Sequence, residues 1–203
     1  MQAQRLSEES EGWQVLHTTE TINFNFCNMK LKSLLTAFLV MLATFAMAQV
    51  EDGKVYRIVS SKYGTVVSES PIKSTLSCAS KGDEKSYQEM WKFTATDDGR
   101  FTIQNVYTQR YMQYAAGKNV QWKTGLSETQ FAVTENATLK KNYNIDLTAG
   151  RNWGMHCDGS SNIVPWSYGP EEGKVTGSEW IFEEVTITAE EMAAAYLEYQ
   201  DFS

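Results

Sequence analysis

The chain has 203 residues, of which 42% are apolar and 12% aromatic, and this composition excludes a disordered or collagen-like protein. Its formal net charge of −7 argues against a nucleic-acid-binding surface, because such surfaces need clustered lysine and arginine. Three cysteines are too few for a disulfide scaffold, and their spacing is not that of a zinc site.

The first predicted element is a secretory signal peptide. Two lysines precede an apolar run over residues 33–47, which closes on the small-x-small sequence Ala46-Met47-Ala48. This run is shorter than the ~20 residues that a membrane-spanning helix needs. We therefore predict a bacterial-type signal peptide over 29–48, after an upstream extension or overcalled start over 1–28. The mature protein is then secreted, periplasmic or at the cell surface, without a membrane span.

Two cysteines, Cys78 and Cys157, remain after cleavage. In an oxidising compartment they either pair or stay as free thiols, and the sequence leaves both alternatives open.

The chain after the signal peptide repeats itself three times, at an interval of about 44 residues. Each repeat opens on an aromatic-x-Ile sequence, continues through an apolar-x-bulky pair and closes on an aromatic-x-apolar sequence. The openings end at Ile58, Ile103 and Ile145, the pairs span 76–78, 120–122 and 164–166, and the closes begin at Trp91, Phe131 and Trp180. These sequences alternate with period two, as half-buried strands do.

The repeats predict an all-β fold. Asp97-Asp98-Gly99 lies between two strand-like segments and indicates a hairpin, and no stretch between Gly53 and Ile187 has a helical period. A single repeat cannot bury its own apolar face, so the three must share one core and close a barrel. We predict a β-trefoil over 53–187, with repeats at about 53–98, 99–141 and 142–187.

The last predicted element is a short helix over 188–203. Thr188 and Glu191 have the spacing of a capping box, and alanines and acidic residues follow as in a helix. This helix either packs on the trefoil or begins a linker toward a downstream domain or a partner protein.

The segment Gln88–Tyr114 resembles the ricin-type β-trefoil lectins, in the degenerate form found on secreted bacterial proteins. Its Gln-x-x-Trp sequence is one residue longer than the Gln-x-Trp signature of that family, and Asp98-Gly99 then leads into an aromatic strand. The resemblance implies a shallow sugar pocket in each repeat, where an aspartate accepts hydroxyl hydrogen bonds and an aromatic ring stacks on the sugar. The aspartate position falls near Ser68, on Gln113 and on His156, none of which is aspartate.

The candidate carbohydrate-binding residues lie in repeats two and three, and repeat one is expected to be empty. The candidates are Tyr111, Gln113, Asn119 and Trp122 in repeat two, and Trp153, His156, Asp158, Asn162, Trp166 and Tyr168 in repeat three. A tryptophan suits the C–H face of a sugar because it combines a large apolar ring with one N–H donor. For Trp122 and Trp166, packing in the core is the alternative to ligand stacking. His156 follows a buried-type residue on an alternating strand and should point outward.

The sequence does not indicate catalysis. His156 is the only histidine after the leader, and no serine or cysteine lies in a nucleophile-elbow pattern. No metal-ligand spacing is present, and no cofactor is implied. We therefore predict a non-enzymatic module whose partner is a glycan or polysaccharide. The alternative is a protein-interaction or scaffold trefoil, of the kind that inhibits proteases through a loop, here 159–178.

Overall fold

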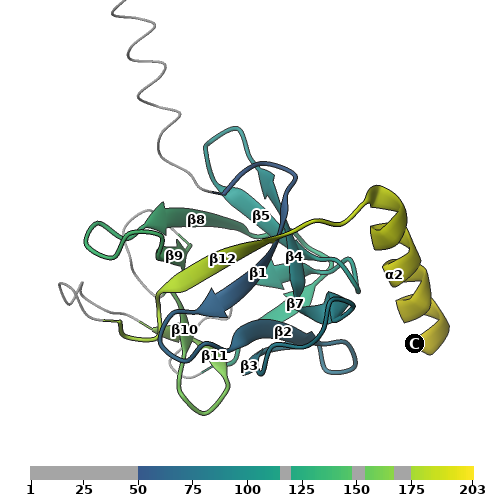
Figure 1. The fold of residues 1–203 in the computed structure, drawn as a ribbon, viewed down its shortest axis with the longest axis horizontal. Coiled ribbons are helices and arrows are strands. Elements are labelled where there is room, and N and C mark those ends of the chain that lie inside the picture. Colours follow the sequence, from purple (N-terminus) through teal and green to yellow (C-terminus); the bar gives the residue numbers. More distant parts are fainter. Residues whose placement is uncertain (1–49, 115–119, 148–153, 167–174) are drawn as a thin grey trace, which may run out of the picture. The chain divides into compact units, whose positions relative to one another are not determined.

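A closed antiparallel barrel forms the body of the protein in the computed structural model, which describes residues 50–114, 120–147, 154–166 and 175–203. Its strands are β1 (Val55–Ser60), β4 (Met90–Ala95), β5 (Phe101–Asn105), β8 (Gln130–Glu135), β9 (Tyr143–Asp146) and β12 (Trp180–Val185). The ring closes because β12 pairs with both β1 and β9, and Figure 1 shows β12 beside β1.

Each repeat adds one hairpin to its two barrel strands. The hairpins are β2 (Val66–Ser70) with β3 (Thr75–Ala79), β6 (Tyr111–Gln113) with β7 (Lys123–Gly125), and β10 (Gly154–Cys157) with β11 (Ile163–Trp166). A single turn of 3-10 helix, η1 (Tyr87–Glu89), precedes β4. Three units of two barrel strands and one hairpin make a β-trefoil, so the predicted fold is confirmed.

Equivalent residues of the repeats meet in the core. Ile58, Ile103 and Ile145 are fully buried, as the shared position in the repeats predicts. The closing tryptophans of repeats one and three make the same hydrogen bond. Trp91 Nε1 donates to the Val67 carbonyl at 2.9 Å, and Trp180 Nε1 donates to the Met155 carbonyl at 3.1 Å.

The middle sequence of the repeats has a different register from the predicted one. The Leu76 N–H donates to the Trp122 carbonyl at 2.9 Å, and the Trp122 N–H donates to the Ile163 carbonyl at 2.7 Å. These three side chains are fully buried, whereas Val120 is 44% exposed. Trp122 is therefore equivalent to Ile163, and its predicted equivalence to Trp166 is wrong. Trp166 lies three residues beyond Ile163, and an odd displacement of this kind puts a side chain on the opposite face of its strand.

The C-terminal helix α2 (Ala189–Phe202) packs against the trefoil, which is the first of the two predicted alternatives. The predicted capping box is present: the Glu191 N–H donates to Thr188 Oγ1, and the Thr188 N–H donates to Glu191 Oε2. Ala195 is buried in a small apolar cluster beside the barrel. The other buried members of this cluster are Val55, Met90 and Val106.

Candidate ligand-binding site

The β10–β11 hairpin carries the most exposed aromatic surface of the three hairpins. Along β10, Met155 and Cys157 are buried and His156 is half-buried, so the strand alternates between core and surface. Gly154 lies opposite Trp166, and His156 lies opposite Val164. His156 and Trp166 are thus diagonal neighbours on one face of the hairpin, within reach of each other.

His156 and Trp166 form an aromatic pair, which we call the platform. Their ring centroids are 5.2 Å apart and their planes differ by 22°, which is a stacked arrangement. Trp166 is 41% exposed even with one face on the imidazole. The platform therefore exposes the indole ring of Trp166 to solvent, while the imidazole of His156 stacks on one of its faces.

The segment before β12 fixes the imidazole of the platform. His156 Nδ1 lies 2.8 Å from the hydroxyl of Ser178, which is fully buried. Gly177 has a φ of +105°, and a Cβ there would lie 2.8 Å from the Cys157 carbonyl oxygen and 3.0 Å from His156 Cε1. Only glycine allows this close approach, so the segment orients the ring.

The surroundings of His156 favour its neutral imidazole over the charged form. Burial lowers its pKa, and the nearby Lys62 ammonium lowers it further. Among the described residues, the hydrogen bond to Ser178 is the one recorded for this ring, and it uses Nδ1. No described residue is hydrogen-bonded to Nε2, which makes this atom the candidate contact for a ligand hydroxyl, as donor or acceptor according to the tautomer.

Asp158 and Asn162 shape the turn between β10 and β11. Asp158 Oδ1 accepts the N–H groups of Ser160 and Asn162, and Asp158 Oδ2 accepts Asn162 Nδ2 at 3.0 Å. Partial burial raises the pKa of Asp158, but these hydrogen bonds outweigh it and hold that pKa below its usual value. The two side chains are near the platform in sequence, but their polar atoms are engaged with the turn itself.

The candidates of repeat two do not form an exposed aromatic site. Trp122 is completely buried and stacks on Phe131, with ring centroids 5.4 Å apart. The expected stacking surface on Trp122 is therefore absent, because its register places the indole in the core. Gln113 folds over Gly125 and donates from Nε2 to the Ser127 carbonyl, and Tyr111 beside it is half-buried.

Trp153, Tyr168 and Asn119 lie outside the described residues.

The sequence did not indicate that Lys62 and Ser178 belong to this site. Lys62 Nζ lies 5.2 Å from the centroid of the Tyr63 ring, and a Cβ on Gly159 of the β10–β11 turn would lie 3.0 Å from Tyr63 Oη. Tyr63 of repeat one therefore borders the hairpin of repeat three.

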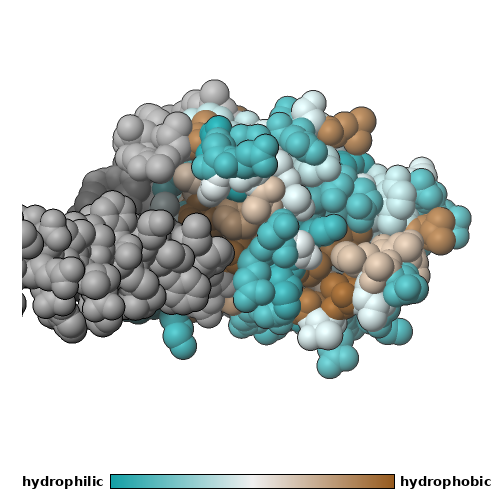
Figure 2. Space-filling model, turned by 90° about the horizontal axis from the view of Figure 1, so that it is seen from above, coloured by the Kyte–Doolittle hydropathy of each residue, from teal (hydrophilic) through white to brown (hydrophobic). Residues whose placement is uncertain are grey.

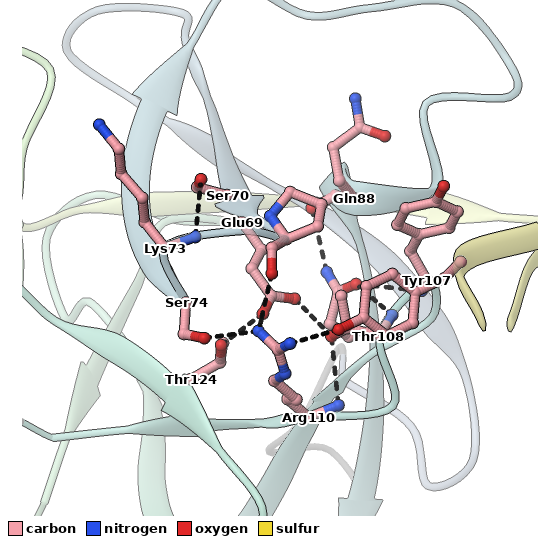
Figure 3. Close-up of polar contacts among 12 residues, drawn as sticks. Glu69, Ser70, Lys73, Ser74, Gln88, Tyr107, Thr108, Arg110 and Thr124 are labelled. Carbon is pink, nitrogen blue, oxygen red and sulfur yellow. Dashed lines mark hydrogen bonds and ion pairs between the residues drawn. The ribbon is translucent and has the colours of Figure 1, made fainter. Parts of the chain in front are cut away.

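A second polar cluster surrounds Glu69, whose side chain is completely buried (Figure 3). Glu69 Oε2 accepts the Thr108 hydroxyl at 2.6 Å, and Oε1 accepts the Thr124 hydroxyl and lies 3.4 Å from Arg110 Nη1. Burial raises the pKa of this carboxyl. Both oxygens are engaged and hidden, so the cluster joins repeats one and two and offers nothing to a ligand.

The same cluster anchors α2. Arg110 Nη2 donates to the hydroxyl of Tyr199, and the guanidinium lies 5.5 Å from the centroid of that ring. Tyr107 packs against the same ring, at 5.4 Å between centroids.

A groove of about 510 Å³ lies between α2 and the barrel. Its walls combine polar and apolar side chains. They come from Lys92, Gln104, Asn105, Val106, Gln109, Ala189, Met192, Ala193 and Tyr196. Figure 2, which views the domain from above, shows brown apolar surface among teal hydrophilic side chains. The residues that line the groove include no acidic side chain and no exposed, stacked pair of aromatic rings like the platform.

In the described part of the chain, neither a metal-binding cluster nor a membrane-spanning helix is found. No group of three or more His, Cys, Asp or Glu side chains there is arranged to hold a metal ion. No helix there is both long and apolar enough to cross a membrane.

Comparisons with known proteins agree with the fold. No family model matches the chain, and no curated protein matches it significantly. The ricin B-like lectin of Macrolepiota procera, solved in complex with lactose, is similar with a TM-score of 0.57 at 14% identity, over 67% of this chain and 99% of that one. The Rhizoctonia solani agglutinin gives a TM-score of 0.54 at 15% identity, over 68% and 99%.

A Clostridium perfringens endo-β-galactosidase that releases GlcNAcα1-4Gal is also similar, with a TM-score of 0.52 at 12% identity, over 66% of this chain but 33% of the enzyme. The chain thus has the fold of the ricin B-like β-trefoil lectins.

Proposed function

We propose that the protein is a non-catalytic, lectin-like module that binds glycans through the platform of repeat three. The observation that carries this proposal is the exposed, stacked pair of Trp166 and His156. The indole supplies an apolar face for the C–H groups of a sugar ring, and Nε2 of the neutral imidazole supplies one polar contact. The lectin folds that resemble this chain support the proposal, and the signal-peptide pattern of 29–48 adds that the module is exported.

The site is shallow, and this limits its affinity. One exposed ring and one free polar atom give a small contact area, so we expect dissociation constants from millimolar to micromolar, roughly −4 to −8 kcal/mol. Useful avidity then requires several copies of the module on one surface.

A glycan array with the chain and its Trp166→Ala variant tests this proposal. We expect a glycan signal for the unmodified chain and a loss of at least about tenfold in affinity for the variant, because the stacking surface is removed. The matched control is Phe202→Ala, which removes an aromatic ring that is 70% exposed on α2.

Phe202→Ala should leave the glycan signal unchanged, and both variants should melt within about 4 °C of the unmodified chain. An array without any signal would overturn the proposal and favour the protein-interaction alternative. A signal that survives in Trp166→Ala would place the binding site elsewhere.

A further inference from the structure

Two buried cysteines from different repeats meet in the core. Cys78 lies on β3 of repeat one and is 3% exposed, and Cys157 lies on β10 of repeat three and is 2% exposed. Both belong to the same apolar cluster, and both are free thiols. Each thiol is the largest influence on the pKa of the other, so the two side chains are close neighbours in this cluster.

The backbone around the two thiols is held in register. The Cys78 N–H donates to the Ser161 carbonyl at 2.8 Å, and Ser77 forms an isolated antiparallel bridge with Asn162. On the other side, the Cys157 N–H donates to the Gly177 carbonyl at 2.9 Å. These contacts hold the backbone of both cysteines in place at the junction of repeats one and three.

We propose that Cys78 and Cys157 become joined by a disulfide when the chain folds in an oxidising environment. The bond would link the hairpin that carries the platform to repeat one, across the apolar cluster. This inference does not depend on glycan binding. It concerns the two cysteines that remain after the predicted signal-peptide cleavage, and export is what would supply the oxidising environment.

The chemistry is thiol–disulfide exchange with a low-molecular-weight or protein disulfide, for example oxidised glutathione. One cysteine thiolate attacks the donor disulfide and forms a mixed disulfide, releasing one donor thiol. The second cysteine thiolate then displaces the remaining donor thiol and forms the Cys78–Cys157 bond. Two cysteine thiols are oxidised by two electrons, the donor disulfide is reduced to two thiols, and the two cysteine protons pass to the donor sulfurs.

In the folded chain the contact with Cys78 lowers the pKa of the Cys157 thiol to about 7, and the same contact raises the pKa of Cys78. This contact forms only on folding, so it does not decide which sulfur attacks the donor first. Because both sulfurs are buried once the chain has folded, the donor must react before the β10–β11 hairpin closes on the barrel.

The test uses the full chain with Cys27→Ser, which removes the cysteine upstream of the domain. The protein is refolded with oxidised glutathione, then denatured without reductant and titrated with a thiol reagent. We expect no free thiol, and a tryptic digest should contain peptides 74–81 and 152–174 joined by one disulfide. Two free thiols, or glutathione on each cysteine separately, would overturn the proposal.

Thermal melting gives a second readout. The bond closes a loop of about 80 residues, so reductant should lower the melting temperature of the oxidised protein by on the order of 10 °C. The Cys78→Ala/Cys157→Ala double variant should melt at one temperature with or without reductant. An oxidised protein whose melting temperature does not respond to reductant would contradict the proposal, whatever the glycan array shows.

Discussion

Replacing Trp180 by alanine is expected to lower the free energy of unfolding by about 3–5 kcal/mol. Trp180 is completely buried in the barrel core, and its Nε1 donates to the Met155 carbonyl. Truncation therefore leaves a large cavity together with a buried carbonyl that has lost its donor. Urea unfolding of the variant and the unmodified chain measures the difference directly.

Two matched tryptophan variants serve as controls. Trp91→Ala should cost about as much as Trp180→Ala, because Trp91 is equally buried and makes the equivalent bond to Val67. Trp166→Ala should cost less than about 1 kcal/mol, since that ring is largely at the surface. If Trp91→Ala were as mild as Trp166→Ala, repeats one and three would not share one core.

Replacing Arg110 by methionine is expected to cost about 3–5 kcal/mol at neutral pH. The guanidinium is the positive partner of Glu69, whose side chain is completely buried, and it also holds Tyr199 of α2. Methionine keeps much of the apolar stem but leaves the carboxylate with two hydroxyl donors and no opposite charge. Urea unfolding again gives the measurement.

The pH dependence of this loss identifies its cause. Burial already raises the pKa of Glu69, so the folded protein holds this proton at a higher pH than the unfolded chain. The stability that protonation contributes is present at low pH and lost as the pH rises through the folded pKa. Without Arg110 that pKa rises further, so the deficit of Arg110→Met should be smaller near pH 5 than at pH 8. Adding Glu69→Gln should recover part of the deficit at pH 8, and no recovery would mean that lost packing is the cause.

The β-trefoil could be predicted because its signal is repeated. Ile58, Ile103 and Ile145 recur with aromatic partners, and each contributes to one shared core. The helix could also be predicted, since the capping box of Thr188 and Glu191 is a local pattern with its own hydrogen bonds. Local and periodic features of this kind can be predicted from the sequence without knowing which distant residues are in contact.

The register of the hairpins could not be predicted in the same way. Trp122 and Trp166 both follow an apolar residue by two positions, yet one indole is in the core and the other is at the surface. The difference arises from hydrogen bonds between hairpins of different repeats, such as that from Trp122 to Ile163. A one-chain pattern does not contain this information, because the run from Ile163 to Trp166 is apolar throughout and does not show which of its residues face the core.

The candidate site shows the same limit. His156 and Trp166 were recognised as residue types that suit a sugar, but their stacking depends on the pairing of β10 with β11. Asp158 and Asn162 have polar side chains that suit a sugar, but both are hydrogen-bonded within the turn between β10 and β11. Ser178 is distant in sequence, and its role in orienting the imidazole follows only from the close approach at Gly177.

Chemical-shift mapping by NMR tests most directly whether the platform is the ligand-binding surface. The labelled chain is titrated with a glycan that the array selects, and the indole N–H of Trp166 and the ring signals of His156 are followed. These two rings should show the largest changes, with saturation at millimolar to micromolar glycan. Changes confined to Tyr111 and Gln113, to the groove beside α2, or to no part of the domain would contradict the assignment of the site to repeat three.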